Sequence, residues 1–223
     1  MNEKIILGIE TSSRVSSVAV VSESKILSEI NQEVRLTHSE TLLPHIEQVL
    51  KIADKKIDAV AVSIGPGSFT GLRIGLAAAK SLAYAWQVKI IGVPTLNAMA
   101  KHFPTAKVIP LVDAQKNRAY FQIFKNTLPQ SETEIKPIDE IINLAKSFDE
   151  EIFLCGDVLH KIKIDLPQNV KLAPINLRMP RASNVAICGM NLLDAGKFDN
   201  VMNMEPLYIR RSEAEELWEA RQK

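Results

Sequence analysis

Two turns of this sequence carry residue types that can hold a phosphate or its metal ion. The segment Glu10-Thr11-Ser12-Ser13 follows one strand-like run, and Asp113 follows a second, with Gln115 and Lys116 close behind. Two such turns facing each other across a cleft would suit a nucleotide, and Glu10 and Asp113 would act as paired carboxylates only if the fold brings them together. The alternative is that the hydroxyl groups only cap turns.

A third candidate is the glycine turn Gly65-Pro66-Gly67-Ser68, which lies between a buried strand and the start of a helix. Backbone N–H groups and the helix dipole favour an anion there. The spacing is not that of a Walker A loop, and Arg73 rather than a lysine lies near the helix start. The sequence favours the simpler reading, in which Gly65 and Gly67 make a tight turn.

Nucleophilic and metal chemistry find little support. Gly67-Ser68-Phe69-Thr70-Gly71 has its serine one place too early for a nucleophile elbow, and the four histidines form no HExxH motif. Cys155 and Cys188 form no CxxC motif and are expected to be reduced, packed thiols. We therefore expect no catalytic nucleophile and no zinc-protease site.

Alternating and periodic patterns define the elements that position these residues. We expect helices near 38–53, irregular at Pro44, and over 68–86, 95–103, 138–148, 182–193 and 212–221. We expect strands over 4–9, 15–21, 25–31, 57–64, 88–93, 108–112, 119–124 and 152–154. The order is βββαβαβα and then a looser βββαβα, which indicates an internal duplication in an α/β protein. The boundary is expected near Pro104, giving domains 1–104 and 105–223.

The helix over 68–86 carries a ridge of small residues spaced by four: Gly71, Gly75, Ala79 and Ala83. Such a ridge lets another backbone approach closely. Because the helix is apolar nearly all round, both of its sides must be covered. The second cover is either another chain or another part of the same domain, and the sequence leaves both open. If it is another chain, the expected interface also includes Leu42, Leu43, Ile46, Leu50, Leu72 and Leu76.

Composition excludes several classes of protein. Lys plus Arg total 27 and Asp plus Glu 26, a net charge of +1, so the whole surface does not bind nucleic acid. No segment is long and apolar enough to span a membrane, and the N-terminal run ends too early for a signal peptide. We therefore expect a cytoplasmic protein. Arg178, Arg181, Arg210 and Arg211 could face an acidic partner or RNA, but a solvated face offset by nearby glutamates is the simpler reading.

Several motifs occur in an order typical of one family. They are Leu7-Gly8-Ile9-Glu10-Thr11-Ser12, His38-Ser39-Glu40, the run from Gly65 to Gly75, Pro110-Leu111-Val112-Asp113-Ala114 and Glu205-Pro206-Leu207-Tyr208-Ile209-Arg210. In these motifs the sequence resembles the TsaB (YeaZ) family over nearly its whole length.

The resemblance implies two tandem domains of the actin-like ATPase (ASKHA, ribonuclease H-like) type. It also implies a role in making threonylcarbamoyladenosine (t6A) beside the anticodon of tRNAs that read codons beginning with A. The family is the non-catalytic partner of a larger paralogue, TsaD, which transfers the threonylcarbamoyl group, and a small ATPase, TsaE, completes the assembly. TsaD binds metal through an HxxxH motif, and Thr95 and Met99 stand at the matching positions here. A hydroxyl and a thioether are poor ligands for such a cation, so the further expectation that no metal is bound comes from this resemblance.

These implications lead to one expectation and one rival. We expect a non-catalytic scaffold that binds and stabilises TsaD, meets tRNA only through the complex, and forms a homodimer when alone. No cofactor is expected, although weak or vestigial binding of ATP or ADP stays open. The rival is a small ATP-dependent phosphotransferase of the same fold.

Overall fold

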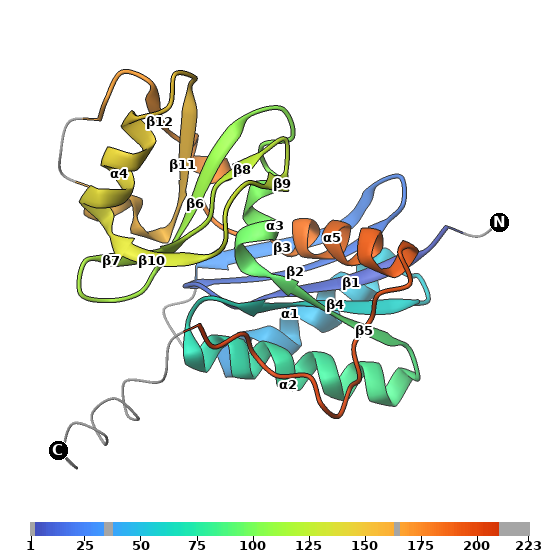
Figure 1. Ribbon diagram of the computed structural model, residues 1–223. Coiled ribbons are helices and arrows are strands. Elements are labelled where there is room, and N and C mark those ends of the chain that lie inside the picture. The colour runs from blue at the N-terminus through green and yellow to red at the C-terminus, as the bar shows by residue number, and fades with distance from the viewer. Residues whose placement is uncertain (1–2, 34–37, 163–165, 210–223) are drawn as a thin grey trace, which may run out of the picture.

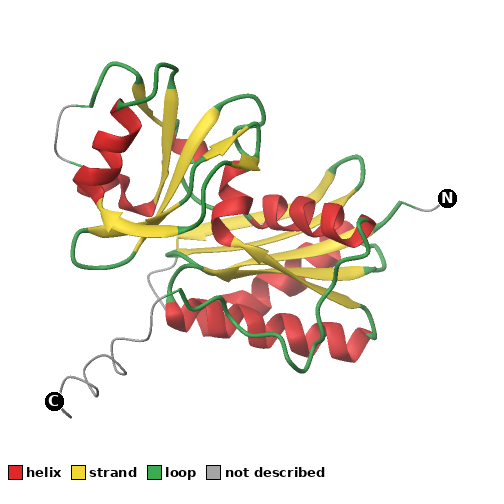
Figure 2. Cartoon of the chain, viewed as in Figure 1, coloured by secondary structure: helices red, strands yellow, loops and turns green. Residues whose placement is uncertain are grey.

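A computed structural model describes residues 3–33, 38–162 and 166–209 of the chain. Its strands form two mixed sheets that lie side by side, each flanked by helices (Figures 1 and 2). The expected helix over 212–221 lies outside the described residues. No helix in the described ranges is long and apolar enough to cross a membrane.

The first sheet has the strand order β3-β2-β1-β4-β5. Its strands are β1 (Ile5–Glu10), β2 (Val15–Ser22), β3 (Ile26–Glu33), β4 (Ala59–Gly65) and β5 (Lys89–Pro94). Strand β2 pairs antiparallel with both β1 and β3, whereas β1, β4 and β5 are parallel. Helix α1 (His38–Ala53) crosses from β3 to β4, and α2 (Phe69–Trp86) crosses from β4 to β5.

The second sheet repeats this arrangement with the order β10-β7-β6-β11-β12. Its strands are β6 (Lys107–Asp113), β7 (Arg118–Phe121), β10 (Glu134–Pro137), β11 (Ile152–Gly156) and β12 (Val170–Leu172), and a small hairpin, β8 (Phe124–Lys125) and β9 (Leu128–Pro129), extends β6. Helix α4 (Ile138–Lys146) corresponds to α1, and among the described residues a 3₁₀ turn, Asp157–Lys161, follows β11 where the first half has α2. The expected duplication and the actin-like, ribonuclease H-like fold class are confirmed.

Alternation along β1 distributes the core of the first half between two faces. Leu7 and Ile9 pack with α1 and α2, whereas Ile6 packs with α5 (Ala182–Asp194) on the opposite face. In the same way α3 (Thr95–Ala100), which follows β5, places Leu96 and Met99 against the second sheet. Each half therefore covers a face of the other half's sheet with its last helix.

This exchange brings together parts of the chain that lie on opposite sides of the expected boundary. Cutting the chain at residue 104 would separate α5 from the first sheet, whose strands β1, β2, β4 and β5 it contacts. It would also separate α3 from the second sheet. The first structural unit consists of about residues 3–94 with 182–209, and the intervening chain builds the second unit around α3 and β6.

Beyond α5 the chain continues as a segment, residues 199–209, that we call the strap. Asp199 forms a bridge with Ile90 on β5, and the buried Met204 joins the core of the first half. Lys80 on α2 donates to the carbonyl oxygens of Met202 and Met204 at 3.1 and 3.2 Å. The strap thus runs past the edge of the sheet and along α2 towards the junction of the two halves (Figure 1).

The ridge on α2 packs inside its own half, which favours the second of the two alternatives that the sequence leaves open. A Cβ atom at Gly75 would collide with Thr11 Oγ1, and one at Gly71 would collide with the Thr11 carbonyl oxygen. Ala79 and Ala83 are buried in the core beneath the helix. Small residues are needed here because the turn after β1 lies directly against the helix.

Most of the other residues expected at an interface with another chain are also buried in the fold. Leu42, Ile46, Leu72 and Leu76 are buried, and Leu50 is half-buried against the core. Leu43 alone among the ten residues is well exposed, at 59%.

Candidate functional site

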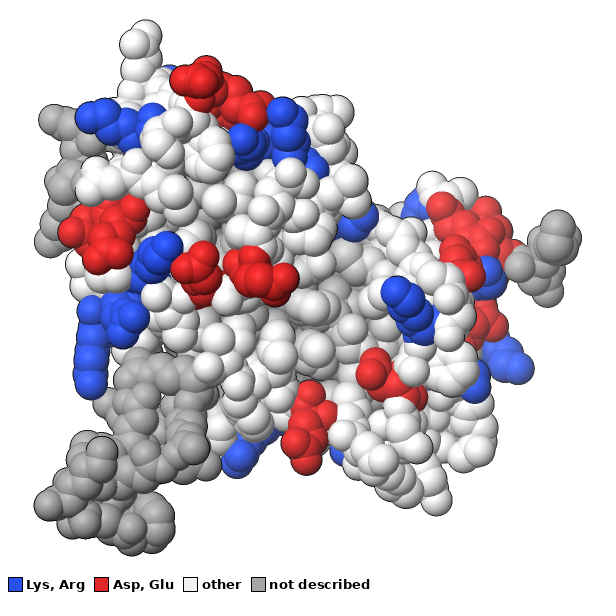
Figure 3. Space-filling view, viewed as in Figure 1, with Lys and Arg blue, Asp and Glu red and all other residues white. Residues whose placement is uncertain are grey.

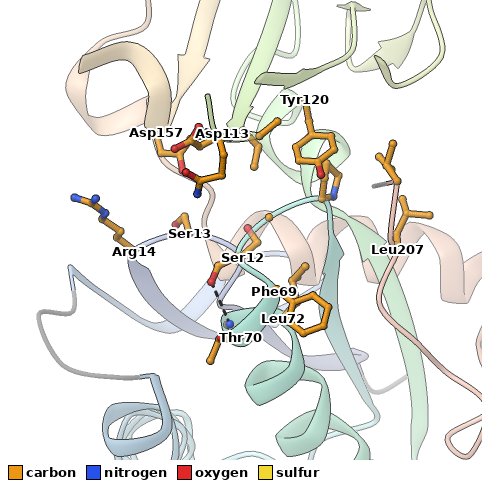
Figure 4. Close-up of a pocket in the computed structure, with 18 of the residues that line it drawn as sticks. Ser12, Ser13, Arg14, Phe69, Thr70, Leu72, Asp113, Tyr120, Asp157 and Leu207 are labelled. Carbon is orange, nitrogen blue, oxygen red and sulfur yellow. Dashed lines mark hydrogen bonds between the residues drawn. The ribbon is translucent and has the colours of Figure 1, made fainter. Parts of the chain in front are cut away.

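A cleft of about 560 Å³ lies where the two halves meet. One wall is the turn between β1 and β2, with Ser12, Ser13 and Arg14, together with the first turn of α2 (Figure 4). The opposite wall is the turn between β6 and β7, with Asp113 and Tyr120. The remaining lining residues are His38, Pro66, Gly67, Ser68, Phe69, Thr70, Gly71, Leu72, Ile74, Val112, Ala114, Gln115, Lys116, Asp157, Leu207, Tyr208 and Ile209.

Ser68 organises the wall made by α2. Its side chain accepts a hydrogen bond from the Gly71 N–H at 3.2 Å and so caps the helix. Its own N–H donates to the Ser12 carbonyl oxygen at 2.7 Å, which fixes the β1–β2 turn against the helix start. Gly67 permits this approach, because a Cβ atom there would lie 2.6 Å from Ser12 Cβ.

Of the residues expected to bind phosphate, Ser12, Ser13, Gly67 and Asp113 line the cleft. Thr11 does not, because its hydroxyl donates to the Gly71 carbonyl oxygen at 2.8 Å inside the fold. Gly65 does not either: it is buried beside Leu72 and Leu207, with a φ of +111° that favours glycine.

Glu10 is fully buried and does not line the cleft. One of its oxygens accepts from the Ser12 N–H at 2.5 Å, and the other has no partner at hydrogen-bond geometry in the described part of the chain. Burial raises the pKa of the Glu10 carboxyl, because the charged form loses its hydration. Since Asp113 faces the cleft and Glu10 does not, the two carboxylates do not form the pair considered from the sequence.

Asp113 is held by its own half of the molecule. Its carboxylate accepts from Lys161 at 2.6 Å and from the Gln115 N–H at 2.9 Å. Asp157 lies beside it and accepts from the Asp113 N–H at 3.1 Å. Burial and the neighbouring charge of Asp113 raise the pKa of the Asp157 carboxyl.

Several cleft residues were missed by the sequence reasoning. His38, whose Nε2 bonds to the Ser13 carbonyl oxygen at 2.8 Å, comes from the start of α1. Leu207, Tyr208 and Ile209 come from the strap, where the Leu207 N–H donates to the Ile64 carbonyl oxygen at 2.7 Å. The Glu205–Arg210 motif could have singled out this segment, but nothing in the sequence indicates that it returns to the first half.

Two members of the arginine cluster considered from the sequence lie in the described part of the chain, and each has a partner there. Arg178 donates to the Ala173 carbonyl oxygen at 2.8 Å, and Arg181 pairs with Glu29 at 3.6 Å. Arg210 and Arg211 lie outside the described residues.

The two cysteines are free and buried, as expected. Burial raises the pKa of the Cys188 thiol to about 11 and raises that of Cys155 further. Both thiols therefore stay protonated at neutral pH and are poor nucleophiles.

Comparison with known proteins agrees with this architecture. The family model described as "TsaD: tRNA N6-adenosine threonylcarbamoyltransferase" matches residues 26–218. The chain is 31% identical to the tRNA threonylcarbamoyladenosine biosynthesis protein TsaB of Buchnera aphidicola subsp. Schizaphis graminum (strain Sg), over 81% of this chain and 90% of that protein. It is 28% identical to the protein of the same name from Bacillus subtilis (strain 168), over 98% and 99% of the two chains.

The chain belongs to the TsaB (YeaZ) family. Among solved structures, YeaZ from Pseudomonas aeruginosa superposes with a TM-score of 0.77 at 20% identity. The superposition covers 92% of this chain and 100% of that chain. This likeness supports the fold. The TsaB sequences and the TsaD family model together show that the chain and the transferase family share ancestry and architecture.

Proposed function

We propose that this chain is a non-catalytic subunit of the machinery that makes threonylcarbamoyladenosine in tRNA. In this role it binds and stabilises a TsaD-type transferase, meets TsaE in the same assembly, and pairs with a second copy of itself when the transferase is absent. Its membership of the TsaB family supports the pathway, and the match to the TsaD family model supports a partner of similar fold. We expect the assembly to act in the cytoplasm.

The observation that best supports the non-catalytic role is that Thr95 and Met99 are both buried in the fold. The family resemblance places the metal-binding histidines of the transferase at these two positions. Here Thr95 is fully buried and its hydroxyl bonds to Ser63 Oγ at 2.7 Å. Met99 is 1% exposed and packs in the core between α3 and the second sheet. Both side chains are committed to packing, and neither suits a hard or borderline cation.

The docking surface is proposed on the outer faces of α1 and α2. These neighbouring helices expose Leu43, Ile52 and Tyr84 by 59%, 61% and 60%. Large apolar side chains that gain nothing from folding are expected where another chain covers them. The buried ridge beneath them keeps the two helices fixed to the sheet, so the outer faces form a rigid surface.

The test is co-purification of the full chain with a tagged TsaD from the same cells. Leu43→Asp and Tyr84→Ala should each weaken association by roughly tenfold to a hundredfold, as loss of a central contact does. Their melting temperatures should stay close to wild type, because both side chains are exposed. Leu128→Asp is the matched control, since Leu128 is 64% exposed on β9 in the other half. Unchanged association in both variants would contradict the proposed surface, and failure of the wild-type pair to associate would contradict the proposed function.

The competing function is an ATP-dependent phosphotransferase, and the cleft between the halves is the observation that favours it. Calorimetric titration of the pure chain with ATP and magnesium, followed by a turnover assay, separates the two. Tight binding with hydrolysis would favour the enzyme. Glu10 is buried and Asp113 is already paired with Lys161, so neither carboxylate is well placed to bind the metal ion of a metal–phosphate complex in this cleft.

A further inference from the structure

We propose that the cleft between the halves binds a ribonucleotide unit of unpaired RNA at its mouth. This goes beyond the proposed function, in which tRNA reaches the chain only through the complex. Three independent features point to the same ligand: unsatisfied polar groups, unpaired cations and an aromatic platform. All of them lie around the first turn of α2 and the two turns that face each other (Figure 4).

The unsatisfied polar groups are Ser12 Oγ and His38 Nδ1. Both residues line the cleft, Ser12 is 1% and His38 is 9% exposed, and neither atom has a partner at hydrogen-bond geometry among the described residues. A buried polar group without a partner is costly, so these atoms indicate an absent ligand or water. They adjoin the N-terminus of an 18-residue helix, where the dipole favours a phosphate.

The hydrogen-bonding roles of His38 Nδ1 and Ser12 Oγ suit the ribose and phosphate of a nucleotide. Because His38 Nε2 faces the Ser13 carbonyl oxygen at 2.8 Å, that nitrogen carries the proton and donates. Nδ1 is then an acceptor, which a 2′-hydroxyl or a base amino group can satisfy. The Ser12 hydroxyl can donate to a phosphate oxygen. A phosphate alone would leave the His38 acceptor empty.

The cations lie on equivalent turns of the two halves. Arg14 follows Ser13 on the β1–β2 turn, and Lys116 is on the β6–β7 turn across the cleft. Within the described part of the chain neither pairs with an acid, whereas the nearby Asp113 is already paired with Lys161. The positive charge is local: on the face shown in Figure 3, cations and acids form small mixed groups. Two such cations at one mouth suit a phosphate backbone.

The aromatic platform lies at the first turn of α2, on the same cleft as the cations. Phe69 and Tyr208 lie 5.2 Å apart between ring centres and keep 39% and 43% of their surfaces exposed. Arg73 fixes the pair, since its guanidinium lies 3.9 Å from the centre of the Phe69 ring and its Nε donates to the Tyr208 hydroxyl at 3.0 Å. Tyr120 projects from the opposite wall (Figure 4). Exposed rings next to cations are the means by which proteins hold unstacked bases.

Fluorescence anisotropy on the pure full-length chain tests this site. The probes are a labelled single-stranded oligoadenylate of roughly 12 nucleotides, a duplex RNA of the same length, and unlabelled AMP as competitor. We expect the single strand to bind more tightly than the duplex, because paired bases cannot offer their faces. Phe69→Ala should weaken binding by about 5- to 100-fold, as loss of one stacking contact does. Arg14→Ala with Lys116→Ala should lower the slope of log affinity against log salt by about 2.

Controls and outcomes separate this inference from the proposed function. Lys55→Ala with Lys197→Ala removes two exposed cations elsewhere and should leave the salt slope nearly unchanged. If AMP binds as tightly as the oligonucleotide, RNA is not the ligand of this site, and the site binds a free nucleotide instead. Equal binding by wild type and both cleft variants would overturn the site itself. The cleft variants should still co-purify with TsaD, so that loss of RNA binding and loss of the partner are distinguishable.

Discussion

Glu10 shows how the direction of a single side chain decides whether it belongs to a site. Along β1 the even-numbered residues point to the α5 face, and Glu10 continues this alternation into the core. Thr11 points the other way, against α2, and only Ser12 and Ser13 reach the cleft. The sequence identifies the turn, but it cannot tell which of four neighbours reaches the opening, because that depends on where the strand ends.

The buried charge of Glu10 has a measurable cost. Glu10→Gln keeps an acceptor for the Ser12 N–H and removes a carboxylate whose second oxygen has no partner. We expect the variant to be more stable than wild type at pH 7 by about 1–2 kcal/mol. Because the pKa of Glu10 is raised in the folded state, the folded chain binds the extra proton. The penalty is therefore full above the raised pKa of the folded state and disappears as the pH falls towards the unfolded value of 4.5.

Chemical denaturation at pH 7 and at pH 4.5 measures both parts of this prediction. Glu132→Gln, at an exposed position, is the control and should leave the free energy of unfolding unchanged at both pH values. A Glu10→Gln variant that is less stable at pH 7 would mean that the ionised carboxylate makes a favourable interaction in the fold.

At the scale of elements, the long helix α2 was predicted well and its surroundings were not. It begins at Phe69, ends at Trp86 and is capped by Ser68, in agreement with the predicted range. The small-residue ridge was also a correct signal of close approach. Periodicity shows that a backbone approaches, but it does not show which one, and the turn after β1 fills the place considered for a second chain.

Gly75→Ala tests this packing directly. Helix propensity favours alanine by about 1 kcal/mol, so an uncrowded site would be stabilised. Here the new Cβ would collide with Thr11 Oγ1, which cannot move freely because it donates to the Gly71 carbonyl oxygen. We expect a net loss of about 1–3 kcal/mol and a melting temperature lower by several degrees.

Ser81→Ala, at an exposed position of the same helix, is the control and should not lower the melting temperature. The paired measurement is thermal unfolding together with association with TsaD. Unchanged stability with lost association would show that the ridge faces another chain after all.

At the scale of the whole molecule, His102 connects the end of α3 to the segment that leads to α5. It follows α3, and its Nε2 lies 3.2 Å from the Met179 carbonyl oxygen on the segment that leads to α5. Burial lowers the pKa of His102, and also that of His45, which contacts Ser16 and Gln32. Since both values lie below the ordinary 6.5, the unfolded chain binds more protons as the pH falls.

Stability should therefore decline as the pH drops through about 6.5. His102→Gln and His45→Gln should each flatten this decline in a series of melting curves between pH 5 and pH 8. Glu10 acts in the opposite direction, so each variant is compared with wild type at the same pH. If the melting temperature of both variants falls with pH as steeply as that of wild type, His102 and His45 do not cause the loss of stability.

The exchange of helices between the halves also decides how the molecule unfolds. Duplication and strand order were predictable, because each half repeats its hydrophobic runs in order. The exchange was not, because an apolar stripe on α3 or α5 shows that a helix is covered without showing by which sheet. Two domains divided at residue 104 would unfold independently and the fragment 1–104 would fold alone. In the structure that fragment lacks α5, which would leave Ala59, Ala61 and Ile91 uncovered.

We therefore expect one cooperative transition. In hydrogen exchange under increasing denaturant, β1 and β4 should lose protection together with β6 and β11, because neither sheet keeps a complete core without the other half's helix. Ala186→Leu, which crowds the fully buried contact between α5 and the first sheet, should lower the protection of both sheets by a similar free energy. Ile187→Leu, at a partly exposed neighbour on α5, is the control. Protection lost from the first sheet alone, or a fragment 1–104 with a cooperative melting curve, would show that the halves are independent domains joined only by the chain.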